Sequence, residues 1–121
     1  MPRRRIHRAC RRMNNVMNEL SHALLMIGGR EIDLRLTREE DGLRLCLEGD
    51  YPPERRHEME RLAQLLQPDV RDPALVEAYG ELMGEEQYSD EGEIALVGHL
   101  LNESSVTVEP GKIKMDLYLA F

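Results

Sequence analysis

The chain has 121 residues, of which 41% are hydrophobic and 32% charged, and its net charge is −7. This length suffices for one domain with a core of its own, and we predict a single domain over residues 1–121. No run of about 20 apolar residues is present, so we expect no transmembrane helix and no membrane contact. The two cysteines lack metal-ligand spacing and are typical of reduced thiols in a cytoplasmic protein.

The charge is distributed unevenly along the chain. Residues 1–12 contain six arginines and no acidic residue, so all 23 acidic residues lie in the remainder. An acidic body argues against a nucleic-acid groove over most of the surface. We expect residues 1–12 to form a basic helical extension that is either solvated or docked on an acidic protein surface.

The first predicted element is a long amphipathic helix over residues 6–27. Its apolar side chains recur at steps of three and four, and it would be roughly 33 Å long at 1.5 Å per residue. Gly28 and Gly29 are expected to end it, because glycine adopts the left-handed cap conformation without a Cβ penalty.

A β-hairpin is predicted next, because the apolar period changes to two. Alternating runs at 32–37 and 43–47 flank an Asp-Gly pair, which is a strong hairpin signal. With a two-residue loop, Leu36 would face Leu47 on the apolar side of this hairpin.

The second half of the sequence predicts further helices, over residues 54–67, 72–84 and 94–101. Residues 85–92 between the last two are acidic and are expected to form a loop. A second hairpin is predicted over 106–119, around the Pro110-Gly111 turn, with Thr107 facing Lys114.

This order of elements predicts the fold class. Both hairpins have one apolar face, and the helices are amphipathic. We therefore predict an α+β two-layer sandwich, in which helices cover one face of a four-stranded sheet made of two hairpins and the other face stays open.

Two stretches carry a resemblance to a known superfamily. They are "NELSHALLMIGG" at 18–29 and "GEIALVGHLLNESSVTVEPGKIKMDLYL" at 92–119. Together with the element order, they resemble the ATP-binding domain of the GHKL superfamily, in particular histidine-kinase catalytic domains and anti-sigma-factor kinases. The resemblance covers about residues 13–119. It implies a histidine-kinase-ATPase-like fold, with ATP and magnesium as cofactors.

The first motif of that superfamily is only partly present. The resemblance places Glu19 on its acidic position and Ala23 on the asparagine that coordinates magnesium. Alanine cannot do this, because magnesium requires oxygen ligands. A shifted register that uses Asn14 and Asn18 ranks second, because it breaks the match of the two glycines to the strand entry.

The second and third motifs are also altered. Glu48 or Asp50 in "LEGDYPPE" could imitate the acid that binds adenine, but Tyr-Pro-Pro replaces the glycine-rich turn that should follow. Gly92 in "SDEGEIALVG" is the single glycine of the turn that should cradle phosphates. Acidic residues surround it and would repel a triphosphate.

These departures lead to the functional prediction. We expect a non-enzymatic regulatory or protein-binding domain, with no catalytic residue, no metal site and no cofactor. The alternative is an active ATP-binding serine or histidine kinase of the anti-sigma type, in which Glu19, Asp50 and Gly92 would bind the nucleotide.

A homodimer is predicted from the length of the first helix. Residues 31–37 span only about 23 Å as a strand, against roughly 33 Å of helix. The first two turns, including Met13, would then overhang the domain with an uncovered apolar stripe. We expect a second copy to cover residues 3–17.

Overall fold

The computed structural model describes residues 3–72, 74 and 90–121. Its elements, in chain order, are α1 (Arg3–Ile27), β1 (Ile32–Arg38), β2 (Gly42–Asp50), a 3₁₀ turn (Pro53–Arg55), α2 (Arg56–Leu66), α4 (Asp90–Leu100), β3 (Glu103–Glu109) and β4 (Lys112–Ala120). The predicted helix over 72–84 lies outside the described residues except for its first part. There, Asp72 Oδ1 accepts the N–H of Ala74 (3.0 Å).

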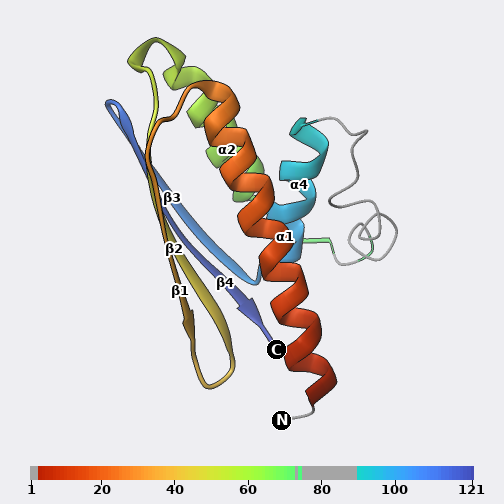
Figure 1. Cartoon of the computed structure of the whole chain (residues 1–121). Coiled ribbons are helices and arrows are strands. Elements are labelled where there is room, and N and C mark those ends of the chain that lie inside the picture. The colour runs from red at the N-terminus through yellow and green to blue at the C-terminus, as the bar shows by residue number, and fades with distance from the viewer. Residues whose placement is uncertain (1–2, 73, 75–89) are drawn as a thin grey trace.

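The strands form a single antiparallel sheet in the order β1-β2-β4-β3. The two hairpins meet at its centre, where β2 pairs with β4. Figure 1 shows α1, α2 and α4 on the same side of this sheet. The predicted α+β architecture, with helices on one face of two joined hairpins, is confirmed at this level.

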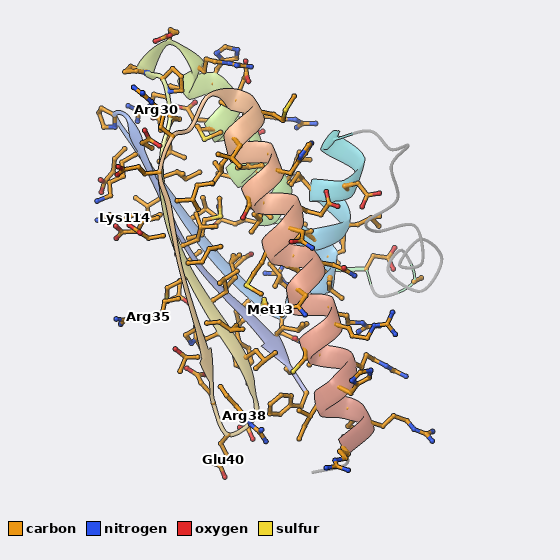
Figure 2. The ribbon with its side chains drawn as sticks, viewed as in Figure 1. Met13, Arg30, Arg35, Arg38, Glu40 and Lys114 are labelled. Atoms are coloured by element: carbon orange, nitrogen blue, oxygen red, sulfur yellow. The ribbon has the colours of Figure 1, made fainter. Side chains whose placement is uncertain are left out.

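The core lies between α1 and the central strands. The α1 side chains buried in it are Ala9, Met13, Val16, Leu20 and Leu24. Figure 2 shows Met13 pointing from α1 towards the sheet. The opposing residues on β2 and β4 are leucine, isoleucine and methionine, and the described core contains Tyr51 as its aromatic residue. The amphipathic helix predicted from the apolar spacing is therefore correct.

The predicted glycine cap of α1 is also confirmed. Gly28 has a φ of 115°, in the left-handed region, and its N–H donates to the Leu25 carbonyl (3.1 Å). The Gly29 N–H donates to the Leu24 carbonyl (2.9 Å). This pair of bonds is the Schellman motif, which satisfies the last carbonyls of a helix.

The expected overhang of α1 is largely wrong. Met13 is 0% exposed and Ala9 is 2% exposed, so both belong to the chain's own core. The length comparison used the strand of seven residues, β1, whereas β2 and β4 each have nine. The end of β4, near Leu119 and Phe121, reaches the beginning of α1. Only the residues before Ala9 extend past the core.

The register of the first hairpin differs from the prediction. Leu36 pairs with Leu45, not with Leu47. Glu39 N–H donates to the Gly42 carbonyl (2.8 Å), so the two-residue loop precedes Gly42. A Cβ on Gly42 would lie 2.5 Å from the Leu119 carbonyl oxygen. A glycine is needed here because β4 packs closely against it. Gly42 therefore lies at the start of β2 and not in the turn.

The register of the second hairpin is as predicted. Thr107 pairs with Lys114 and Glu109 with Lys112. Gly111 occupies the turn with a φ of 74°. A glycine that allows a left-handed turn residue fixes this loop, and the alternating side chains follow from it.

The face of the sheet opposite the helices is polar. Arg44 at its centre forms ion pairs with Glu39 (2.8 Å) and Asp116 (2.6 Å), and these contacts raise its pKa. Its guanidinium also lies over the Tyr118 ring. Among the helices that the structure describes, none is both long and apolar enough to cross a bilayer.

A candidate binding groove at the junction of three helices

A groove lies where the end of α1, one side of α2 and the beginning of α4 meet. It has a volume of about 490 Å³. Its lining residues are Ala23, Met26, Ile27, Arg55, His57, Glu58, Arg61, Leu62, Leu65 and Ile94. Most of the lining is apolar, and the charged side chains all come from α2 and the turn before it.

Arg55 holds one wall of this groove together. Its Nε and Nη2 donate to the two carboxylate oxygens of Glu58 (3.0 and 2.7 Å), and its Nη1 donates to the Ile27 carbonyl (2.8 Å). The hydrogen bond from Arg55 lowers the pKa of Glu58. One guanidinium thus ties the C-terminal end of α1 to the start of α2, at an end of α1 where carbonyl groups carry partial negative charge.

An exposed apolar side chain, Met26, lines the groove from α1, and the residue before it in the chain, Leu25, is also exposed. Met26 is 65% exposed and Leu25 is 55% exposed. The polar part of the lining contains two arginines, one histidine and one glutamate. The groove therefore combines an apolar surface with charged side chains, of which Arg55 and Glu58 are paired with each other.

The first sequence motif meets this groove at one position. Ala23 lines the groove, opposite Ile94 from α4. Glu19, one turn earlier on α1, is 5% exposed and is not among the lining residues.

The third motif lies on α4 and not in a loop. Asp90, Glu91 and Gly92 form the first turn of α4, so the loop expected up to residue 92 is wrong at its end. Gly92 itself is exposed, and the neighbouring Glu93 is 4% exposed. The helix begins earlier than expected because these polar residues precede the apolar run that was used to locate it.

Asp50, the candidate from the second motif, has a different environment. Its Oδ1 accepts the N–H groups of Arg30 (2.7 Å) and Glu31 (2.9 Å). The hydrogen bonds from Glu31 and Arg30 lower the pKa of Asp50. The carboxylate thereby fixes the connection between α1 and β1. Asp50 is not among the residues that line the groove.

The Tyr-Pro-Pro sequence after Asp50 is also part of the packing. Tyr51 is 3% exposed, and its hydroxyl donates to the Glu109 carbonyl. A Cβ on Gly28 would lie 2.9 Å from Pro52 Cγ, so this turn packs closely on the end of α1. The turn that should accommodate adenine in the resembling superfamily is here used to close the domain.

The groove residues on α2 were not identified from the sequence. The sequence did contain a signal, because Leu65 widens the apolar stripe of that helix beyond its buried residues Met59, Leu62, Ala63 and Leu66. A stripe of this width is expected when a helix contacts two partners. Which of its side chains stay accessible depends on how α4 packs against it.

The described lining does not fit magnesium-bound ATP. Glu58 is its only carboxylate, and Arg55 already binds both of its oxygens. Across residues 3–72, 74 and 90–121, no group of three or more His, Cys, Asp or Glu side chains could hold a metal ion. Magnesium requires oxygen ligands in octahedral geometry, which Ala23 and Ile94 cannot supply.

A second, basic hollow lies near the N-terminus. Arg5, Arg8 and Arg12 line it on one side of α1, and it has a volume of about 260 Å³. No described acidic side chain lies within ion-pair distance of these arginines. Of the three, Arg5 lies in the first turn of α1, at the positive end of the helix dipole, where a positive charge is unfavourable.

Comparisons of the chain with protein-family models, curated proteins and solved structures find no match. The likeness of residues 18–29 and 92–119 to a GHKL domain therefore remains a resemblance in pattern and element order. Function has to be inferred from the groove and from the surfaces of the sheet.

Proposed function

We propose that this chain is a non-enzymatic regulatory domain that binds a segment of a partner protein in the groove between α1, α2 and α4. The supporting observation is the mainly apolar lining, which includes Met26, a side chain that is 65% exposed. Grooves of this kind between helices accept the apolar face of an amphipathic helix. The flexible Met26 side chain can adapt to such a face.

The charges in the groove suggest the chemistry of the bound segment. Arg55 in the 3₁₀ turn is paired with Glu58, and Arg61 lies on α2. A segment with apolar residues three and four positions apart would complement the apolar part of the lining, and polar residues beside them would face these charged side chains.

The proposal includes a fold of the histidine-kinase-ATPase type from which nucleotide binding has been lost. It is supported by the element order and by Ala23 and Ile94, which bring α1 and α4 together at the groove. It also includes a cytoplasmic location, in keeping with the exposed free thiols of Cys10 and Cys46.

The alternative is an active ATP-binding kinase of the anti-sigma type. Its support is the groove volume of about 490 Å³, which lies within the usual range for small-molecule sites. Thermal unfolding with millimolar ATP and magnesium separates the two functions. We expect no shift, whereas nucleotide at 100 times its Kd would add about 2.7 kcal/mol. A magnesium-dependent increase in Tm would contradict the proposed function.

The groove itself is tested by site-specific crosslinking. A photoreactive residue in place of Met26 should crosslink a discrete partner in extracts of the native host. Val70, which is 78% exposed and lies outside the groove, is the matched control position. Adding Leu65→Glu to the Met26 probe should abolish the product. If both positions label the same proteins, or if Leu65→Glu has no effect in a folded domain, the groove is not the docking site.

A further inference from the structure

The edge strand β1 forms a second exposed surface, separate from the groove. Its seven residues pair with β2 without a bulge, and it lies at the end of the sheet order (Figure 1). Leu34 and Leu36 pair with the buried Leu47 and Leu45, so they point to the helix side of the sheet. They are nevertheless 42% and 46% exposed. The helical layer leaves Leu34 and Leu36 largely uncovered.

The backbone of β1 also has hydrogen-bonding groups that no described segment reaches. Glu39 N–H donates to the Gly42 carbonyl, and Asp50 N–H donates to the Glu31 carbonyl. Hydrogen-bonded positions alternate along an antiparallel pair, so the odd-numbered residues of β1 bond to β2. The N–H and C=O groups that point outward belong to Ile32, Leu34, Leu36 and Arg38. No hydrogen bond from another described segment reaches these groups.

The open face of β1 carries two opposite charges that have no ion-pair partner among the described residues. Asp33 lies across from Glu48, a like charge, and Arg35 lies across from Cys46. Neither Asp33 nor Arg35 forms an ion pair with any described residue of its own chain. Figure 2 shows Arg35 pointing away from the helical layer.

From these three observations we propose that β1 pairs antiparallel with β1 of a second copy, so that two sheets become one continuous sheet. Backbone pairing between edge strands is a common mode of association. Residues that pair share a face, so even-numbered residues of one copy must pair with even-numbered residues of the other.

The charged residues favour one register among those that pair even-numbered with even-numbered residues. With Leu34 opposite its own copy, Ile32 meets Leu36 on the helix side. On the open face, Asp33 of each copy then meets Arg35 of the other. A register shifted by one step, with Arg35 opposite its own copy, would place two like charges together, which is unfavourable. The strand is therefore self-complementary in one register, in both its apolar and its charged residues.

This interface differs from the dimer expected through residues 3–17. That expectation relied on an apolar overhang, but Ala9 and Met13 are buried within the chain. Removing residues 1–13 would damage the core, so truncation does not test either interface. Substitutions at exposed positions are required.

Light scattering of the full chain over a range of concentrations, up to hundreds of micromolar, measures the association. We expect a dimer, and we expect Leu34→Lys to weaken it by about tenfold or more, since two lysines would then face each other at the symmetry axis. Val70→Lys, at an exposed apolar position away from the sheet edge, should leave the dimer unchanged. Circular dichroism checks that each variant folds.

A charge exchange gives the sharper test. Asp33→Arg alone and Arg35→Asp alone should each weaken the dimer, because each places like charges opposite one another. A mixture of the two single variants should form a heterodimer, and the double variant should dimerise like the original chain.

The proposal is wrong if the original chain is monomeric throughout. It is also wrong if none of the β1 variants changes a dimer that does form. In that second case Arg4→Glu and Arg8→Glu, both at exposed positions, would show whether residues 3–17 form the interface.

Discussion

The two edge strands of the sheet, β3 and β1, differ in whether side chains of the same chain bond to their outward backbone groups. At the β3 edge, side chains of the same chain reach the outward backbone: Gln67 Oε1 accepts the Val106 N–H (3.2 Å) and Arg56 Nη2 donates to the Val108 carbonyl (3.4 Å). At the β1 edge, the even-numbered residues make no such contact with the described part of the chain. One edge is closed by α2 and its surroundings, and the other remains open.

The difference follows from where the chain places its helices. α2 packs on β3, and Arg71 after it bonds to the end of α4 and the start of β3. α1 lies over the central strands, and among the described elements β1 has extensive contacts only with β2. Natural sheets protect their edges with bulges, prolines, charges or covering segments. An edge with none of these except single charges is suited to pairing with another chain.

The closed edge should depend most strongly on Gly98. A Cβ at this position would lie 2.1 Å from the Leu65 carbonyl oxygen, because α4 and α2 pack closely there. Gly98→Ala should force the helices apart and lower the free energy of unfolding by about 3 kcal/mol. Urea denaturation measures this loss.

Gly111→Ala is the control for Gly98→Ala. It has a positive φ but nothing within 4 Å of an added Cβ. Its cost should be about 1 kcal/mol, from backbone conformation alone. Equal losses at the two glycines would show that the helices are not in close contact at Gly98.

The next largest effect is expected at Arg71. Its guanidinium donates to the Gly98 carbonyl (2.7 Å), the Asn102 carbonyl (3.2 Å) and Ser104 Oγ (2.8 Å). Arg71→Ala should reduce stability by about 2 kcal/mol, because half-buried acceptors lose a charged donor. Arg35→Ala on the open edge should change the stability of the monomer by less than about 0.5 kcal/mol. Urea denaturation of the two variants compares their losses of stability. A larger loss for Arg35→Ala would contradict the description of β1 as the open edge.

Through Asp50, the contribution of the connection between α1 and β1 to stability should depend on pH. Because its folded pKa is lowered, its contribution to stability is present above the ordinary pKa of an aspartate and is lost as pH falls through the lowered value. We expect Asp50→Asn to reduce Tm at pH 7, with a difference that shrinks as the pH falls below about 4. Thermal unfolding of both proteins between pH 7 and pH 2 measures it. A difference that is constant with pH would show that the carboxylate charge is not what holds the Arg30 and Glu31 amides.

Among the side chains that close the β3 edge, the smallest effect is expected at Gln67. Gln67→Ala removes the acceptor of the Val106 N–H at the exposed edge of β3. Stability should fall by about 0.5 kcal/mol, since water can replace an exposed hydrogen bond. Hydrogen exchange of the Val106 amide should accelerate, while amides in β2 and β4 stay protected. An unchanged exchange rate would mean that the side chain does not protect this edge.

Local patterns in the sequence predicted most elements, and some errors have identifiable causes. The spacing of apolar residues located α1, and the two glycines after it gave its cap. The Pro110-Gly111 turn gave the register of the second hairpin because Gly111 does occupy a left-handed turn. In the first hairpin, the same rule failed at Gly42, because that glycine accommodates the Leu119 carbonyl and the Tyr118 ring across the sheet.

The groove was less accessible to sequence reasoning than the fold. Ala23 was found through a motif position, but Arg55 and Glu58 acquire their roles only when the end of α1 comes within hydrogen-bonding distance. Asp50 was selected for its chemical type, and the structure shows that its carboxylate binds backbone amides. Chemical type alone cannot distinguish a ligand-binding carboxylate from one that caps a loop.

The sequence by itself determined the kinds of element and their order, because helical and strand periods and glycine caps depend on neighbours within a few residues. Tertiary structure alone decided that Ala9 and Met13 would be buried, that Gly42 would lie in a strand and that one sheet edge would be closed while the other stayed open. These outcomes depend on contacts between residues far apart in the chain, such as Gln67 with Val106 and Ala9 with the end of β4. The relative lengths and positions of whole elements create those contacts, and no local pattern encodes them.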